Sequence, residues 1–271
     1  DAVTFGTNGF YQKYGATEDA DVFADSADRS VHTMTVGGNT HTDTTTKKIG
    51  TASAEFDGTG DYLYVDGSNT TDTNSDFVFT GDFTVEGWVY PNSSGSGEAH
   101  LIAHWKVGAY TSGWAVQYTH STNKFGAWVN FNTSGTDQDT LTQSGTSAED
   151  AWYHVALTRS GDVYTLWVDG ASEATTTNAG TLVENSAVYL AIGAGVHTGG
   201  AAYYLDGFID EVRISDTARY TGTFTPSATA FTADANTLLL LHMDGANDGT
   251  TFTDSSWTGA PRHTITANGD V

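Results

Sequence analysis

The sequence predicts an all-β protein, and three observations support this. Residues 152–170 alternate between apolar and polar side chains with the period of two expected of a strand with one buried face. Gly, Thr, Ser, Asp and Asn are abundant beside 13 Tyr, 13 Phe and 7 Trp, which is typical of strands joined by turns. Long runs of Leu, Glu, Lys and Ala at helical spacing are absent. The 271 residues therefore form one large β domain or two small ones.

The most regular element is a β-hairpin over residues 152–170. In its first strand Tyr153, Val155 and Leu157 share one face. Residues 160–162 form the turn, because Gly and Asp tolerate the left-handed backbone of a tight reversal. A lone hairpin is not stable in water, so the rest of the chain must supply more strands.

Further strands are predicted along the chain. They cover residues 9–14, 31–36, 52–57, 62–65, 83–90, 101–105, 113–119, 124–131, 187–192, 203–214 and 237–243. Pro91 ends one of them, because proline cannot donate to the ladder. The four leucines at 238–241 form a run too short for a helix, and Asp244 and Gly245 end it.

The strand predicted over residues 124–131 has two different faces. The apolar face carries Phe125, Ala127, Val129 and Phe131. The other face places Trp128 beside Asn130 and Asn132. A Trp beside amides is unusual for a surface that meets only solvent, so this face is a candidate for recognition.

The charge of the chain excludes several functions. The net charge is −23, with only 10 Lys and Arg, so the surface repels nucleic acid and anionic membranes. No apolar run approaches the roughly 20 residues of a membrane span, so we expect no membrane insertion. There are no cysteines, which excludes disulfides and thiolate metal sites.

An internal repeat links the two ends of the chain. Residues 23–26 and 32–38 resemble residues 252–255 and 263–269. One interpretation is that the second copy forms edge strands of a single domain. The alternative is that it starts a further unit, or pairs with a neighbouring subunit by strand addition.

Four stretches, in this order, resemble the laminin G-like family of the concanavalin A-like lectin/glucanase superfamily: residues 54–63, 83–89, 152–170 and 207–214. The resemblance implies a two-sheet antiparallel jelly-roll sandwich with a concave face. It places the core at residues 47–236, between N-terminal strands within 1–46 and C-terminal strands within 237–271 that resemble the start of a further unit.

A narrower resemblance concerns residues 210–215, 218–220 and 224–226, which look like repeated modules of marine bacteriophage virion proteins. It implies an extracellular or virion location. Other virion or filament subunits are then expected partners.

The family resemblance also implies a structural Ca²⁺ ion that ties an early turn to the last long strand. Asp57, Asp61 and Asp210 occupy the matching places, and Ca²⁺ takes roughly six to eight oxygen ligands. The alternative is that Asp57 and Asp61 only shape the turn, while Asp210 pairs with Arg213 or Arg219.

Carbohydrate binding is the favoured function, because sugars stack on aromatic rings and bond to amides and acids. The candidate residues are Glu86, Trp88, Trp114, Trp128, Asn130 and Asn132. Tyr110 and His104 lie near them in sequence. The alternative for each Trp is burial inside the sandwich.

Catalysis is not predicted. The paired carboxylates of glucanases follow a Glu-x-Asp-x-x-Glu pattern that is absent here, and the adjacent Asp210 and Glu211 should point to opposite faces of a strand. We expect a non-enzymatic module that binds surface glycan. Two alternatives remain: a purely structural decoration or fibre protein, which would bury a subunit interface of about 1,000 Å² or more, and a glucanase-like hydrolase.

Overall fold

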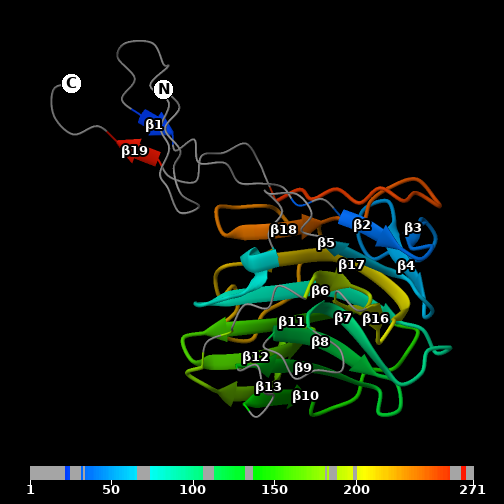
Figure 1. Cartoon of the computed structure of the whole chain (residues 1–271), viewed down its shortest axis with the longest axis horizontal. Coiled ribbons are helices and arrows are strands. Elements are labelled where there is room, and N and C mark those ends of the chain that lie inside the picture. Colours follow the sequence, from blue (N-terminus) through cyan, green and yellow to red (C-terminus); the bar gives the residue numbers. More distant parts are fainter. Residues whose placement is uncertain are drawn as a thin grey trace.

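Two antiparallel β-sheets pack face to face as a jelly-roll sandwich (Figure 1). This computed structural model describes residues 22–24, 32, 34–65, 74–105, 113–131, 137–180, 182, 188–197, 200–256 and 264–266. Within these ranges the helical content is one 3₁₀ turn, η1 (Asn74–Phe77). The all-β prediction is therefore confirmed. In the described ranges no helix is long and apolar enough to cross a bilayer.

The first sheet has seven strands. Their spatial order is β10 (Gln138–Thr142), β9 (Lys124–Asn130), β8 (Gly113–Thr119), β7 (Glu98–His104), β14 (Leu190–Ile192), β5 (Tyr62–Val65) and β2 (Met34–Gly37). Each neighbouring pair is antiparallel.

The second sheet has eight strands. Their order is β13 (Ala171–Thr177), β12 (Val163–Val168), β11 (Tyr153–Ser160), β6 (Phe83–Pro91), β17 (Asp206–Ser215), β4 (Ser53–Asp57) and β3 (His41–Asp43), and β18 (Thr237–Leu241) also pairs with β17. Two small sheets pair β1 (Val22–Ala24) with β19 (Thr264–Thr266), and β15 (Gly195–His197) with β16 (Gly200–Ala202). β1 and β19 lie side by side outside the sandwich (Figure 1).

Most predicted strands are confirmed, and the hairpin over residues 152–170 appears as β11 and β12. The strand predicted over 203–214 begins only at Asp206, because Tyr203 has a left-handed backbone with φ of 59°. The strand predicted over residues 9–14 lies outside the described residues. β4 and β5 belong to different sheets, so the turn between them crosses the sandwich edge.

Alternation along the strands builds the core. Phe125, Ala127 and Val129 of β9 point inward as predicted, and Val85 and Val89 of β6, on the other sheet, belong to the same hydrophobic core. Each of these side chains is buried, and burying apolar surface at about 25 cal/mol per Å² is the main force that holds two such sheets together.

The outer face of the eight-stranded sheet is covered in part by residues 216–236, which we call the crossing segment. Its Tyr220 hydroxyl donates to Glu86 of β6 at 2.6 Å. Its Phe224 and Phe231 rings pack at 5.6 and 6.0 Å from the ring of His154 on β11. The crossing segment therefore removes the centre of this face from solvent.

Candidate functional site

Trp128 and Asn130 lie together on the outer face of the seven-stranded sheet, as the alternation along β9 predicts. Trp128 is half-buried and Asn130 is buried. The third residue predicted beside them, Asn132, lies outside the described residues.

Glu86 and Trp88 belong to the other sheet, so the structure does not bring them to Trp128. Glu86 is fully buried and accepts hydrogen bonds from Arg213 Nε at 2.8 Å and from the Tyr220 hydroxyl, and it also contacts His154 Nε2 at 3.1 Å. Burial by itself would raise the pKa of Glu86, but the His154 contact and the Arg213 charge lower it below its usual value. This carboxylate ties elements together and does not face solvent.

Trp88 is also covered, because it is only 6% exposed. The Lys48 ammonium lies 4.1 Å from the centre of its ring, and the His154 ring meets it edge-on at 5.4 Å. Neither Glu86 nor Trp88 can contact a sugar in this arrangement, since the crossing segment and Lys48 occupy the space above them.

Trp114 points into the sandwich. It is fully buried, and its Nε1 donates to the Phe77 carbonyl at 2.8 Å. His104, directly opposite on β7, stacks near it at 6.4 Å, and burial lowers the pKa of His104 to about 4. Burial inside the sandwich, the alternative weighed for each Trp, is what the structure shows for Trp114.

The candidate site is the surface around Trp128, which we call the Trp128 face: Glu98, His100, Trp105, Gln117, Trp128, Asn130 and Tyr203. The sheet register brings these residues together. His100 of β7 lies opposite Gln117 of β8. In a neighbouring row, Ala103 of β7 lies opposite Ala115 of β8, which lies opposite Trp128 of β9. Residues directly opposite each other on neighbouring strands point to the same side of a sheet, so these side chains share one face.

Two rings on this face reach solvent, on either side of His100. Tyr203 is 37% exposed and stacks on the His100 ring at 4.6 Å. Half-buried Trp128 meets the same ring edge-on at 5.6 Å and packs against Trp105 at 5.4 Å. The Tyr203 carbonyl accepts a hydrogen bond from the His100 N–H at 2.9 Å, which fixes the strained Tyr203 backbone.

Several buried polar atoms of this face make no hydrogen bond within the described part of the chain. His100 is fully buried, and neither of its ring nitrogens has a hydrogen bond. Glu98 Oε1 lies 3.5 Å from His100 Nε2, and Gln117 Oε1 is similarly unpaired. Burial lowers the pKa of His100 despite the nearby Glu98 carboxylate, so the ring is neutral. Buried polar atoms of proteins nearly always have partners, so this group is suited to bond to ligand hydroxyls.

Sequence reasoning misses His100 and Tyr203. The strand predicted from residue 101 is too short by three residues, since β7 starts at Glu98. Extending that strand would have placed Glu98 and His100 on one face, because they are two residues apart. Tyr203 and His100 are about a hundred residues apart in the sequence, so no local sequence pattern predicts their contact.

The three predicted calcium ligands are not brought together. Asp61 accepts the backbone N–H groups of Asn39 at 2.7 Å and Asp57 at 3.1 Å, and Asp57 accepts that of Thr59 at 2.8 Å. Asp57 lies opposite Asp206, four residues before Asp210 on β17, which places Asp57 and Asp210 about 13 Å apart along the strand.

Asp210 is buried in a separate environment. Its Oδ2 accepts the N–H groups of Lys48 and Ile49, each at 2.9 Å, and burial raises its pKa to about 7. The three carboxylates therefore do not fit one shared ion, and the described residues contain no group of three or more His, Cys, Asp or Glu arranged for a metal. Calcium binding stays a prediction.

The expected alternation at Asp210 and Glu211 is wrong, because β17 has a bulge there. Glu211 has a φ of 52°, and the register with β6 shifts between Asp210 and Arg213. Both carboxylates consequently meet segments that cover the outer face: Asp210 meets residues 48–49, and Glu211 accepts the N–H of Phe231 at 2.8 Å.

Comparisons with known proteins agree with this architecture. The sequence profile Laminin_G_3, described as the concanavalin A-like lectin/glucanases superfamily, matches residues 57–222. No curated protein sequence matches the chain.

Three solved structures illustrate the similarity of fold. The chain is 17% identical to the CBM40 of Ruminococcus gnavus IT-sialidase bound to α2,3-sialyllactose, with a TM-score of 0.50, covering 62% of this chain and 91% of that one. It is 15% identical to a putative carbohydrate binding protein from Bacteroides ovatus, with a TM-score of 0.51, covering 84% and 56%. It is 14% identical to the receptor-binding domain of botulinum neurotoxin D, with a TM-score of 0.52, covering 78% and 49%. The chain thus spans about half the length of the last two.

Proposed function

Because the chain belongs to the concanavalin A-like lectin/glucanases superfamily, we propose that it is a non-enzymatic glycan-binding module and that the sugar binds to the Trp128 face. One observation carries the proposal: two partly exposed rings, Trp128 and Tyr203, pack against buried His100, and neither the ring nitrogens of His100 nor Oε1 of the neighbouring Gln117 makes a hydrogen bond in the described part of the chain.

Each part of this face suits a part of a sugar. The C–H groups of a pyranose ring can lie on Trp128 or Tyr203, as apolar surface on an aromatic ring. Neutral His100 offers one donor and one acceptor nitrogen, and Gln117 offers an acceptor oxygen to sugar hydroxyls. A small movement of the Tyr203 side chain would uncover these groups, since that ring stacks directly on His100.

The chemistry favours an uncharged sugar. The Glu98 carboxylate lies 3.5 Å from His100, and the net charge of −23 repels anions. The CBM40 of similar fold was solved with α2,3-sialyllactose, and together with the Bacteroides ovatus protein it supports sugar binding by this kind of sandwich. We propose that this chain prefers a neutral glycan.

A glycan array followed by calorimetric titration of the best neutral ligand tests the proposal. Trp128→Ala and Tyr203→Ala should each weaken binding about ten-fold or more, the effect of removing a ring worth about 1.4 kcal/mol. Trp152→Ala is the matched control, because Trp152 is a partly exposed Trp that packs on Tyr90 of the other sheet. Absence of binding to every glycan, or unchanged binding by both variants, would contradict the proposal.

We propose that the module is non-enzymatic because its adjacent carboxylates, Asp210 and Glu211, are buried away from any substrate. Asp210 and Glu211 are fully buried; backbone N–H groups donate to Asp210 Oδ2, and the Phe231 N–H and His242 contact the Glu211 carboxylate. Incubation with laminarin should release no reducing sugar. Hydrolysis that disappears in one carboxylate variant would establish the glucanase-like alternative instead.

We also propose an extracellular or virion location, with surface glycan and other virion or filament subunits as partners. This part rests on the resemblance of residues 210–226 to phage virion modules. Mass spectrometry of purified virus particles tests this location, and it should detect peptides of this chain. A purely structural protein would instead show a large subunit interface and no glycan binding.

A further inference from the structure

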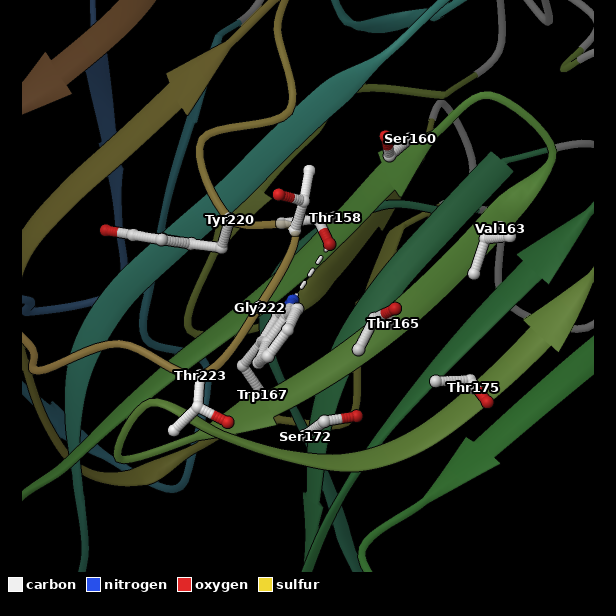
Figure 2. A pocket seen from close by; sticks show the side chains of 11 residues that line it. Thr158, Ser160, Val163, Thr165, Trp167, Ser172, Thr175, Tyr220, Gly222 and Thr223 are labelled. Atoms are coloured by element: carbon white, nitrogen blue, oxygen red, sulfur yellow. Dashed lines mark hydrogen bonds between the residues drawn. The ribbon is translucent and has the colours of Figure 1, made fainter.

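A groove lies on the outer face of the eight-stranded sheet (Figure 2). The Trp128 face belongs to the other sheet, on the opposite side of the sandwich. It is formed by β11, β12, β13 and residues 220–223 of the crossing segment. Its volume is about 430 Å³, which lies within the range of small-molecule sites.

A row of threonines forms one part of this groove. Thr158 of β11 lies opposite Thr165 of β12, which lies opposite Thr175 of β13. Neighbouring strands are about 4.8 Å apart, so the row repeats hydroxyls at that spacing across three strands. Thr165 and Thr175 lie on one side of Trp167, and Thr223 lies on the other (Figure 2).

The groove is fixed before any ligand arrives. Trp167 Nε1 donates to Thr158 Oγ1 at 2.8 Å, which orients the ring. On the crossing segment, the Tyr220 hydroxyl donates to Glu86 at 2.6 Å and the Phe224 N–H donates to the Gly170 carbonyl at 3.0 Å. A preformed site loses little conformational entropy on binding.

The lining chemistry selects one class of ligand. All lining residues except Val163, Trp167 and Gly222 carry a hydroxyl, and none is charged, although the protein has a net charge of −23. An anion would need Arg or Lys here, and a cation would need carboxylates. A purely apolar ligand would leave the hydroxyls without partners. An uncharged ligand with many hydroxyls matches both the threonines and the apolar surface of Val163, which is 41% exposed.

We propose that this groove is a second carbohydrate site, specific for uncharged oligosaccharides and independent of the Trp128 face. The two sites lie on opposite sheets, so one chain binds glycan on both sides of the sandwich.

Gly222 provides a variant that fills the groove without strain. A Cβ at this position meets no atom within 4 Å, and its backbone is not left-handed, so Gly222→Tyr should fold normally and occupy the groove. Gly145 has the same freedom, lies outside the groove lining, and gives the matched control Gly145→Tyr. Thr165→Val removes one hydroxyl at nearly constant volume.

The test is calorimetric titration with laminarihexaose, cellohexaose, mannohexaose and α2,3-sialyllactose. We expect at least one uncharged hexaose to bind, and Gly222→Tyr to weaken it about ten-fold or more. Thr165→Val should weaken it about five-fold, the loss of one hydrogen bond. Gly145→Tyr and Trp128→Ala should retain this binding.

The proposal is overturned if no hexaose binds, if Gly222→Tyr binds like the wild type, or if sialyllactose competes for the groove. Loss of the same binding in Trp128→Ala would show that the sites are not independent and would overturn it too. Failure at the Trp128 face alone is recognised separately: Gly222→Tyr then still weakens hexaose binding to the groove, while Trp128→Ala binds the neutral ligand selected on the glycan array as tightly as the wild type.

Discussion

Glu86 joins three segments that are far apart in the sequence. Its two oxygens contact Arg213 of β17, Tyr220 of the crossing segment and His154 of β11. Removing one partner of a buried ion pair leaves the other charge buried without a counter-charge. Such a substitution lowers stability strongly, even where the intact pair adds little to it.

At the residue scale, we expect Glu86→Gln to lower the free energy of unfolding by about 3 kcal/mol, because the largely covered Arg213 guanidinium then loses its fully buried counter-charge. Urea denaturation measures this change. Glu173→Gln is the control, since the Glu173 carboxylate accepts from Ser144 in an exposed position and its loss should cost less than about 1 kcal/mol. Equal effects of the two substitutions would contradict the role given to Glu86.

At the scale of elements, the crossing segment depends on a close approach to the turn after β12. Gly170 has a φ of 79°, and a Cβ there would overlap the carbonyl oxygen of Phe224. We expect Gly170→Ala to destabilise the protein by about 2 kcal/mol and to loosen the groove. Thermal unfolding measures the effect. Gly145→Ala should change stability by less than about 0.5 kcal/mol, since its Cβ meets nothing within 4 Å.

The turn between β4 and β5 is the element that concerns calcium. If the calcium ion that the family resemblance implies for Asp57, Asp61 and Asp210 binds, the melting temperature should rise in calcium relative to EDTA, because a ligand of the folded state stabilises it. Equal melting temperatures in both buffers would rule out a structural calcium ion. They would leave the backbone hydrogen bonds to Asp57 and Asp61 as the full explanation of the turn.

At the scale of the whole molecule, His32 connects the N-terminal and C-terminal parts of the chain through Asp254. It is buried, and both its N–H and its Nδ1 contact Asp254, at 2.8 and 3.1 Å. Burial by itself would lower the pKa of His32, but Asp254 and Asp76 raise it from 6.5 to about 9. The pair thus closes the fold across 222 residues of sequence.

This raised pKa makes stability depend on pH in one direction. The folded protein holds the proton more tightly than the unfolded chain, so the contribution is complete below pH 6.5 and is lost as pH rises through about 9. We expect the wild type to lose about 2–3 kcal/mol across that window relative to His32→Gln. Denaturant titrations at several pH values measure it. Parallel pH curves for the two proteins would contradict this expectation.

The sequence predicts those parts of the molecule that depend on local alternation. β6, β8, β9, β11 and β12 follow from the period of two, and so do the inward faces of β9 and the outward position of Trp128. The segments that cover a sheet face are set by long-range packing, which the alternation of side chains along a strand does not predict. The crossing segment contacts Glu86 and Lys48 covers Trp88, and the alternation along β6 predicts neither. Tyr203 likewise meets His100 without a sequence signal. The bulge at Glu211 is also invisible to a pattern that assumes strict alternation.

The contact between His32 and Asp254 has a consequence for rearranging the chain. Because residues 32 and 256 lie close together, a short linker can join them without stretching the backbone. New ends can then be opened at the exposed reversal of residues 161–162. Such a circularly permuted protein should keep the sandwich, and it would present its termini beside the Thr165 row, where a fused reporter could sense occupancy of the groove.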